Sequence, residues 1–262
     1  MVMSKEALDE RLTFALKISK ELADYQMSVA KANLGMERKG DGTPVTVVDK
    51  ESEKRFRQAV AYFFPGDEIL GEEEGGGEKT TRWVIDPIDG TRKFMRGLPF
   101  WGICIAFELD GVLELSVVSV PGANLFYSAR RGGGAFLNGK SISVDSTPLV
   151  DLKESFVTMP PRTCFLESGY GEAYDLTQGL IEHDPGFLDA YSYGMISDGR
   201  IHGVLSTMDE WWDIAAPVLI VREAGGVFVD VVDGREPKAG SLNLAGTPRL
   251  VEHLLPLLQK TL

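Results

Sequence analysis

Cysteine and histidine are scarce in this chain. Its 262 residues include two cysteines, Cys104 and Cys164, and three scattered histidines, so neither a disulfide framework nor a Cys/His zinc site is expected. No apolar run approaches the roughly 18 residues that a membrane-spanning helix requires. The first residues carry Glu6, Asp9 and Glu10 and show no apolar stretch typical of a signal peptide. These absences predict a cytoplasmic protein with reduced thiols and no membrane partner.

Positive charge is also in short supply. Lys and Arg number 27 against 39 Asp and Glu, which gives a net charge of −12 at pH 7. A surface of this balance attracts polyanions poorly, so nucleic acid is excluded as an expected partner. A phosphate group can still bind where fixed cations or backbone N–H dipoles gather at one site. The remaining composition, 44% hydrophobic and 25% charged, is that of an ordinary globular protein.

Two patterns divide the chain into halves. Over residues 1–147, two helices (residues 4–33 and 49–64) precede a series of β-strands, whose clearest hairpin signal is Asp110-Gly111 between two apolar runs. Over residues 148–262, strands and helices alternate. The expected strands lie at 156–159, 201–205, 227–231 and 242–245, and the expected helices at 189–199, at 213–224 and after Thr247-Pro248. We therefore predict an α/β protein whose N-terminal half contains an antiparallel sheet.

The segment Asp86-Pro87-Ile88-Asp89-Gly90-Thr91 carries the strongest chemical signal. It follows residues 82–85, which we expect to form a buried strand, where a charge is costly unless it is paired. Two aspartates three positions apart at the end of a strand can face one cleft, and Gly90 permits close approach of the backbone. A helical turn beginning at Thr91 would point free N–H groups at a phosphate. A simple Asx turn at the strand exit is the alternative explanation.

Two further acids indicate a metal site only when they are considered together with this segment. Glu72 belongs to a run of three glutamates, which usually marks a solvated loop, and Asp213 stands where an ordinary helix N-cap is expected. Together with Asp86 and Asp89, they form a set of hard oxygen ligands that contains no His or Cys. Such a set favours Mg²⁺ or Mn²⁺ over zinc.

In order and spacing, these segments resemble the inositol monophosphatase superfamily. The motifs lie at residues 71–73, 83–91, 132–139, 212–216 and 223–226, so the resemblance covers nearly the whole chain. It implies an α/β fold of the inositol monophosphatase and fructose-1,6-bisphosphatase type, a layered αβαβα sandwich. It also implies a metal-dependent phosphomonoesterase that acts on a small phosphorylated metabolite and forms a homodimer.

The resemblance further implies a set of metal ligands. Glu72, Asp86 and the Ile88 carbonyl would hold a first metal, and Asp86, Asp89 and Asp213 would hold a second. Two or three ions of Mg²⁺, or alternatively Mn²⁺, would bind at each site. Most of the ligands therefore come from residues 1–147, and the last comes from residues 148–262 together with the residues that select the substrate.

Catalytic and substrate-binding roles are implied in the same way. Glu72 and Thr91 would position the attacking water, and Asp49 would support Thr91 by a hydrogen bond. A plain helix N-cap is the alternative explanation for Asp49. The amides of Gly90 and Thr91 would hold the phosphate. The residues expected to contact the substrate are Asp89, Gly90, Thr91, Asp189 and Asp213.

Substrate choice depends on a few positions that differ within the superfamily. Inositol phosphatases carry Gly-Thr-Ala where this chain has Leu188-Asp189-Ala190, and the expected glutamate before Asp213 is missing. Residues 89–101, which include Arg96, resemble the histidinol-phosphate phosphatase branch instead, and Asp189 suits a cationic amino group. Alternatively, Arg96 is a surface charge and Asp189 a helix cap. Histidinol phosphate and inositol monophosphate are the leading substrates. The alternatives are 3′-phosphoadenosine 5′-phosphate, fructose 1,6-bisphosphate, or a non-catalytic regulatory role.

Overall fold

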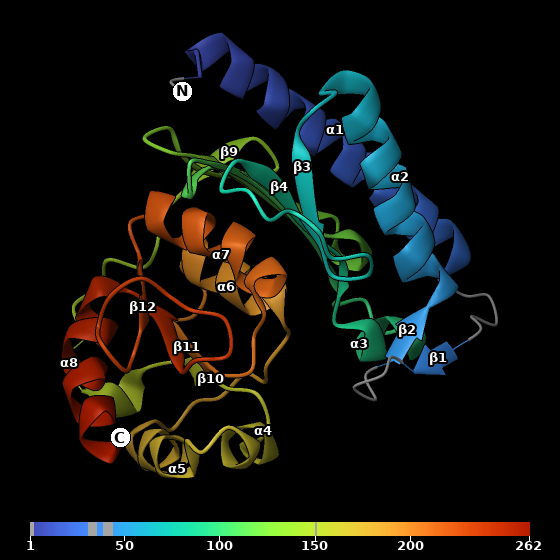
Figure 1. Cartoon of the computed structure of the whole chain (residues 1–262). Coiled ribbons are helices and arrows are strands. Elements are labelled where there is room, and N and C mark those ends of the chain that lie inside the picture. The colour runs from blue at the N-terminus through green and yellow to red at the C-terminus, as the bar shows by residue number, and fades with distance from the viewer. Residues whose placement is uncertain (1–2, 31–35, 39–43, 150) are drawn as a thin grey trace.

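Helices and sheets alternate in five layers in the computed structural model, which describes residues 3–30, 36–38, 44–149 and 151–262. Two helices cover one face of a seven-stranded sheet, and two more lie between that sheet and a four-stranded sheet (Figure 1). A last group of helices covers the far face of the second sheet. The predicted layered αβαβα fold is thus confirmed.

The larger sheet contains the predicted antiparallel series. Its spatial order follows the sequence from β3 to β9; β3 and β4 pair in parallel, and the other neighbours pair antiparallel. Asp110 and Gly111 have φ values of 53° and 79°, as expected of a tight hairpin turn, so this prediction is confirmed. The strands are β3 (Glu68–Gly71), β4 (Arg82–Asp89), β5 (Gly102–Leu109), β6 (Val112–Val120), β7 (Leu125–Arg130), β8 (Gly134–Leu137) and β9 (Lys140–Ile142).

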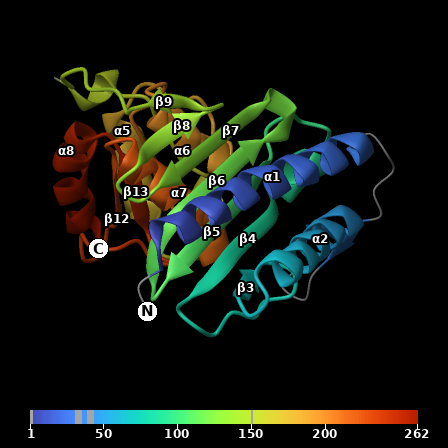
Figure 2. The same ribbon diagram turned by 90° about the horizontal axis from the view of Figure 1, so that it is seen from above.

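Helices α1 (Lys5–Val29) and α2 (Val47–Phe63) lie side by side on the outer face of this sheet (Figure 2). Their apolar faces meet the sheet around Trp83, a side chain that is fully buried among aromatic rings of both helices. Helix α1 ends four residues before the predicted Asn33, which lies outside the described residues. A small ribbon, β1 (Met36–Arg38) with β2 (Pro44–Thr46), precedes α2.

The middle layer is formed by α6 (Ala190–Ser197) and α7 (Trp211–Glu223). Every residue of α7 from 214 to 221 is buried, because one side of the helix faces β5 and β6 while the other faces the second sheet. This explains why its sequence is apolar all round, with no polar stripe. The layer also brings the start of α7 to the end of β4, although 121 residues separate them in the sequence, and this approach builds the site.

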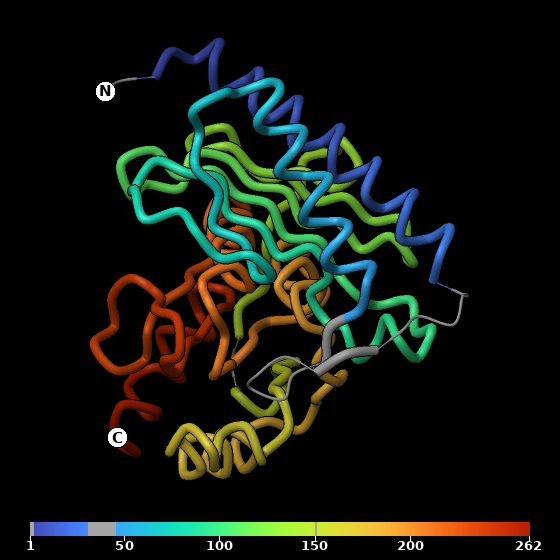
Figure 3. Tube along the Cα trace, turned by 45° about the vertical axis from the view of Figure 1, so that its right-hand side comes forward, coloured from blue at the N-terminus to red at the C-terminus, as the bar shows by residue number. Residues whose placement is uncertain are grey.

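The second sheet has the strand order β10-β11-β13-β12, with β10 and β11 parallel. Thr247 caps α8 and Pro248 is its first residue, as predicted. The sheet strands are β10 (Val157–Thr158), β11 (Gly203–Ser206), β12 (Val227–Asp230) and β13 (Asn243–Gly246). The outer helices are α4 (Arg162–Glu167), α5 (Gly171–Leu180) and α8 (Pro248–Leu258), of which the sequence predicted only the last. The first and last helices therefore occupy opposite outer layers (Figure 3).

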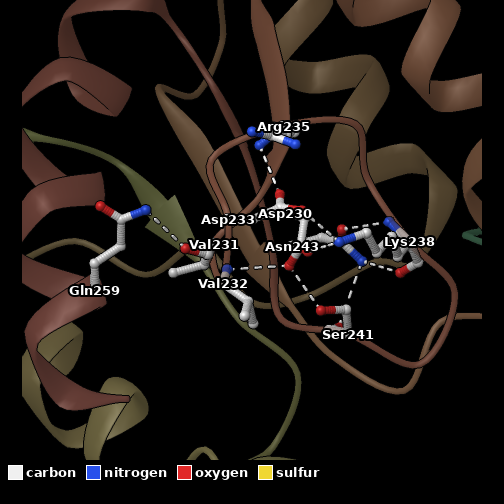
Figure 4. Close-up of polar contacts among 9 residues, drawn as sticks. All are labelled: Asp230, Val231, Val232, Asp233, Arg235, Lys238, Ser241, Asn243 and Gln259. Atoms are coloured by element: carbon white, nitrogen blue, oxygen red, sulfur yellow. Dashed lines mark hydrogen bonds and ion pairs between the residues drawn. The ribbon is translucent and has the colours of Figure 1, made fainter.

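A polar network fixes the connection between β12 and β13. The buried carboxylate of Asp230 accepts hydrogen bonds from Ser241 Oγ (2.7 Å) and Lys238 Nζ (2.8 Å) (Figure 4). The same connection reaches back toward α7, because Gly240 N donates to the Asp209 carbonyl at 2.8 Å. The network therefore supports the segment that leads into the start of α7. Within the described part of the chain, no helix is long and apolar enough to cross a membrane.

Candidate active site

Strand β4 delivers the motif predicted to carry the chemistry. Its pairing with β5 is interrupted between Asp86 and Asp89, which frees these residues from a regular ladder. Gly90 then adopts the left-handed conformation, with φ of 87°, and the short helix α3 (Thr91–Met95) begins. Asp86 Oδ1 accepts a hydrogen bond from Ile88 N at 2.9 Å. The Asx turn weighed as an alternative is therefore present, and it holds the Asp86 carboxylate at the site.

Three of the predicted metal ligands meet at this point. Asp86, Asp89 and Asp213 each offer one carboxylate oxygen, and these oxygens lie within 4.8 Å of one another. Asp213 lies in the first turn of α7, where its Oδ2 accepts a hydrogen bond from Glu210 N at 2.7 Å. Asp89 accepts from Ala190 N at the start of α6. Both middle-layer helices thus orient the acids that face the end of β4.

The electrostatics of the cluster match the binding of a cation. The pKa values of Asp86, Asp89 and Asp213 are all raised well above the ordinary value, chiefly by burial and further by the charges of neighbouring acids. Glu72 contributes to this effect on Asp86. Like charges removed from water together are costly unless a cation joins them. Hard oxygen donors at this spacing fit Mg²⁺ or Mn²⁺, so the residues present suit the metal that the sequence motif implies.

Thr91 is held beside the cluster by Asp49. Thr91 Oγ1 lies 3.2 Å from Asp49 Oδ1 and 3.1 Å from the Ile88 carbonyl oxygen. Asp49 occupies the first turn of α2, and its other oxygen accepts from the Thr46 amide at 2.9 Å, which closes a capping box. Asp49 therefore caps its helix and orients Thr91 at once. Burial raises its pKa, against the effect of the Thr46 hydrogen bonds.

A cavity of about 770 Å³ opens beside these residues. One wall carries four of the residues predicted from the motifs, Glu72, Gly90, Thr91 and Asp189, together with Lys93. The opposite wall comes from α4, α5 and the segment before α6. It contains Met159, Pro160, Pro161, Thr163, Cys164, Tyr174, Asp184, Gly186 and Phe187. The cavity is therefore polar and charged on the side of the acids and largely apolar on the other side.

Asp189 lines this cavity with an unusual backbone conformation and with a side chain that does not cap α6. Its backbone has φ 50° and ψ −137°, a conformation that costs a non-glycine residue about 1–3 kcal/mol. Its side chain forms no capping bond to α6 and instead pairs with Lys93 Nζ. Burial raises the pKa of Asp189, and the Lys93 charge opposes that effect. Gly90 has a φ of 87°, which residues with a side chain rarely adopt, and a Cβ atom there would press on this carboxylate.

Several supporting residues escaped the sequence analysis. Gln26 on α1 donates to the Pro87 carbonyl at 2.8 Å and accepts from Trp101 Nε1 at 3.0 Å. Its only sequence signal is a polar residue on an apolar stripe. Asp209, whose pKa burial raises to about 6, accepts from Ser206 Oγ at 2.5 Å close to the acid cluster. Arg96, in contrast, is exposed, as expected of a surface charge.

Known proteins share this fold and these motifs. The chain matches the inositol monophosphatase family over residues 7–261. It is 34% identical over 234 residues to a histidinol-phosphatase of Chlorobaculum parvum, which covers 85% of this chain and 87% of that protein. It is 31% identical over 271 residues to an inositol monophosphatase of Dictyostelium discoideum, covering 98% and 97%. An IMPase of Thermotoga maritima superposes with a TM-score of 0.85 at 28% identity, covering 96% and 98%.

Fold, acid cluster and relatives together define a phosphatase. The chain belongs to the inositol monophosphatase family, which confirms the resemblance found in its sequence.

Proposed function

We propose that this protein is a Mg²⁺-dependent phosphomonoesterase whose leading substrate is histidinol phosphate. The observation that carries the metal dependence is the meeting of three carboxylates within 4.8 Å at the end of β4. Glu72, Asp86 and the Ile88 carbonyl would hold one ion, and Asp86, Asp89 and Asp213 a second. A divalent cation bound there offsets the charge of the phosphate ester and lowers the pKa of bound water.

The chain's own groups would orient the reactants. Glu72 and Thr91 face the same cavity, so both can hold the attacking water by hydrogen bonds. Asp49 Oδ1 can accept a hydrogen bond from the Thr91 hydroxyl, which leaves an oxygen lone pair of Thr91 free to accept one from that water. The backbone amides of Gly90 and Thr91 would bind the phosphate where α3 begins. The water then displaces the alcohol directly, without a phosphorylated enzyme.

The pairing of Lys93 with Asp189 supports an amino-bearing substrate. The two side chains place a positive and a negative group side by side on one wall of the cavity. Histidinol phosphate carries a phosphate and an ammonium group a few bonds apart, so it can approach both charges at once. Inositol 1-phosphate can use the lysine but leaves the aspartate without a cationic partner from the substrate. The 34% identity with a histidinol-phosphatase points the same way.

Inositol monophosphate is the second candidate. The Dictyostelium relative, which aligns with 98% of this chain, is named an inositol monophosphatase. Against this candidate, no glutamate precedes Asp213 at the position expected of inositol phosphatases, where the chain has Ser206 and Thr207. Fructose 1,6-bisphosphate and 3′-phosphoadenosine 5′-phosphate complete the set of esters to compare.

A phosphate-release assay tests the proposal. Purified protein is given each of the four esters with Mg²⁺ and, in parallel, with excess EDTA. We expect Mg²⁺-dependent release that is fastest, by kcat/KM, with histidinol phosphate. Faster turnover of inositol 1-phosphate would assign the second candidate, and release from none of the four would favour a regulatory protein that retains the fold.

A further inference from the structure

One face of α2 carries three charged residues at intervals of four, Asp49, Glu53 and Arg57, and therefore points them in one direction. Asp49 contacts Thr91, as described above. Glu53 lies one turn further on and is fully buried. A buried carboxylate destabilises the fold unless it has hydrogen-bond or ionic partners, so the contacts of Glu53 indicate its role.

Glu53 is bound to the loop that carries Glu72. Its Oε2 accepts a hydrogen bond from Glu73 N at 2.7 Å, and its Oε1 accepts one from Glu74 N at 3.0 Å. Arg57 balances the charge, since its Nε and Nη2 donate to Glu53 Oε1 at 2.9 and 2.7 Å. The two amides immediately after Glu72 are thus anchored to a helix, not left to solvent.

The rest of the loop is shaped around the same carboxylate. A Cβ atom on Gly71 would collide with the Glu53 side chain, so only glycine permits this approach. Arg57 Nη2 also donates to the Gly75 carbonyl at 2.6 Å, and Gly71 and Gly75 exchange backbone hydrogen bonds of 3.2 and 3.0 Å. The turn is therefore closed on itself and bonded to α2 at Glu73, Glu74 and Gly75.

We propose that Glu53 is a positioning residue that holds Glu72 in place toward the acid cluster. Three consecutive glutamates repel one another, and a loop of this composition has no intrinsic reason to place its first carboxylate beside Asp86. By binding the two following amides, Glu53 fixes the backbone from which Glu72 projects. Helix α2 then positions both of the groups assigned to the attacking water, Thr91 through Asp49 and Glu72 through Glu53. This inference rests on the proposed metal-dependent function.

The variant Glu53→Gln tests the role with nearly unchanged side-chain volume. Its amide NH₂ cannot accept from a backbone N–H, so one anchor is lost along with the charge that pairs with Arg57. Loss of a residue that orients a metal ligand typically weakens metal binding or activity about 10- to 100-fold. We expect the Kd for Mn²⁺, measured by calorimetry without substrate, to rise at least about tenfold. At saturating metal, kcat should fall by a similar factor, with little change in KM.

Glu51→Gln is the matched control. It makes the same chemical change two positions away on α2, where Glu51 pairs with Arg55 at 2.8 Å on the exposed side. Its Mn²⁺ affinity and kcat should equal those of the wild type. If Glu53→Gln does not fold, the same Mn²⁺ affinity and kcat are measured for Arg57→Gln, because the partly exposed Arg57 supports the same loop. We expect that variant to weaken Mn²⁺ binding in the same direction.

The outcomes separate the two proposals. Folded Glu53→Gln protein with a lower unfolding temperature but wild-type Mn²⁺ affinity and kcat would show that Glu53 only stabilises the fold, and would overturn the positioning role alone. The same holds for Arg57→Gln where it replaces the first variant. Wild-type protein that binds no Mn²⁺ and releases no phosphate would instead overturn the metal-dependent function, and the role of Glu53 with it.

Discussion

Lys93 pairs with Asp189 across 96 positions of the chain and thereby joins the start of α3 to the start of α6. The partnership explains a conformation that is otherwise unfavourable, since Asp189 occupies a backbone region suited to glycine. The next residue, Ala190, donates its amide to Asp89, so the strained backbone links the charge pair directly to the acid cluster. The groups proposed to bind phosphate and metal therefore share one junction between α3 and α6.

Metal dependence is the first prediction. The acid cluster contains only hard oxygen donors, so we expect phosphatase activity with Mg²⁺ or Mn²⁺ and none in excess EDTA. Ca²⁺ should inhibit in competition with Mg²⁺, because it prefers more ligands at longer distances. Phosphate release measured across a titration of each ion checks both statements. Full turnover in excess EDTA would contradict them.

The second prediction concerns Asp89→Asn, which removes one charge from the cluster at almost constant volume. We expect kcat to fall at least about 100-fold, the scale seen when a principal electrostatic stabiliser is lost. The asparagine oxygen can still accept from Ala190 N, so the fold should persist. Steady-state kinetics at saturating Mg²⁺ test this, with the exposed Asp24→Asn as control. A kcat within twofold of wild type would remove Asp89 from the site.

The third prediction is a stability profile without metal. The pKa values of Asp86, Asp89 and Asp213 are raised by folding, so the folded state holds protons that the unfolded chain, with ordinary pKa values of about 3.9, has released. The contribution of these groups to stability is therefore present at low pH and is lost as pH rises through the raised values.

Thermal unfolding in EDTA between pH 5 and pH 8 checks this profile. Asp89→Asn has one raised carboxyl fewer, so its unfolding temperature should exceed that of the wild type by a margin that grows with pH. Saturating Mg²⁺ should raise the wild-type unfolding temperature and shrink that margin, because the cation replaces the missing protons. A difference in unfolding temperature that stays constant over this pH range would show that the acid cluster does not cause the pH dependence.

Short-range patterns made much of this architecture predictable. The Asp110-Gly111 pair predicted its hairpin because few residue pairs adopt two successive positive φ values. Residues 86–91 indicated a candidate site because two acids follow an apolar strand. Helices α4 and α5 were missed because they are only 6 and 10 residues long, and such short helices depend on tertiary packing.

Long-range partners outside the motifs could not be predicted. The sequence predicted Asp189 as a substrate contact or a helix cap, and it gave no sign that Lys93 pairs with it. Glu53 likewise looks like one charge among many on α2, and only the fold places the amides that follow Glu72 against it. Sequence motifs predicted the candidate site residues, whereas most of the residues that orient them are recognised only from the three-dimensional structure.

Substrate choice is the last prediction, and it turns on Asp189→Asn. In the proposed complex the substrate ammonium meets the Asp189 carboxylate, and a charge-assisted hydrogen bond of this kind contributes roughly 1.5–3 kcal/mol. Since about 1.4 kcal/mol corresponds to a factor of ten, the KM for histidinol phosphate should rise about 10- to 150-fold. The acid cluster is unchanged, so kcat should be retained.

Inositol 1-phosphate provides the internal control, because it bears no cation and gains nothing from the Asp189 charge. Its KM should stay near the wild-type value, and freeing Lys93 from its carboxylate partner should, if anything, strengthen the hold on the phosphate. Lys93→Gln should act differently and raise KM for both esters, since both present a phosphate to the lysine. Equal losses on the two substrates with Asp189→Asn would mean that the aspartate serves only to fix the α6 junction. In that case the discrimination would have to come from the opposite wall of the cavity, where Tyr174 and Phe187 lie.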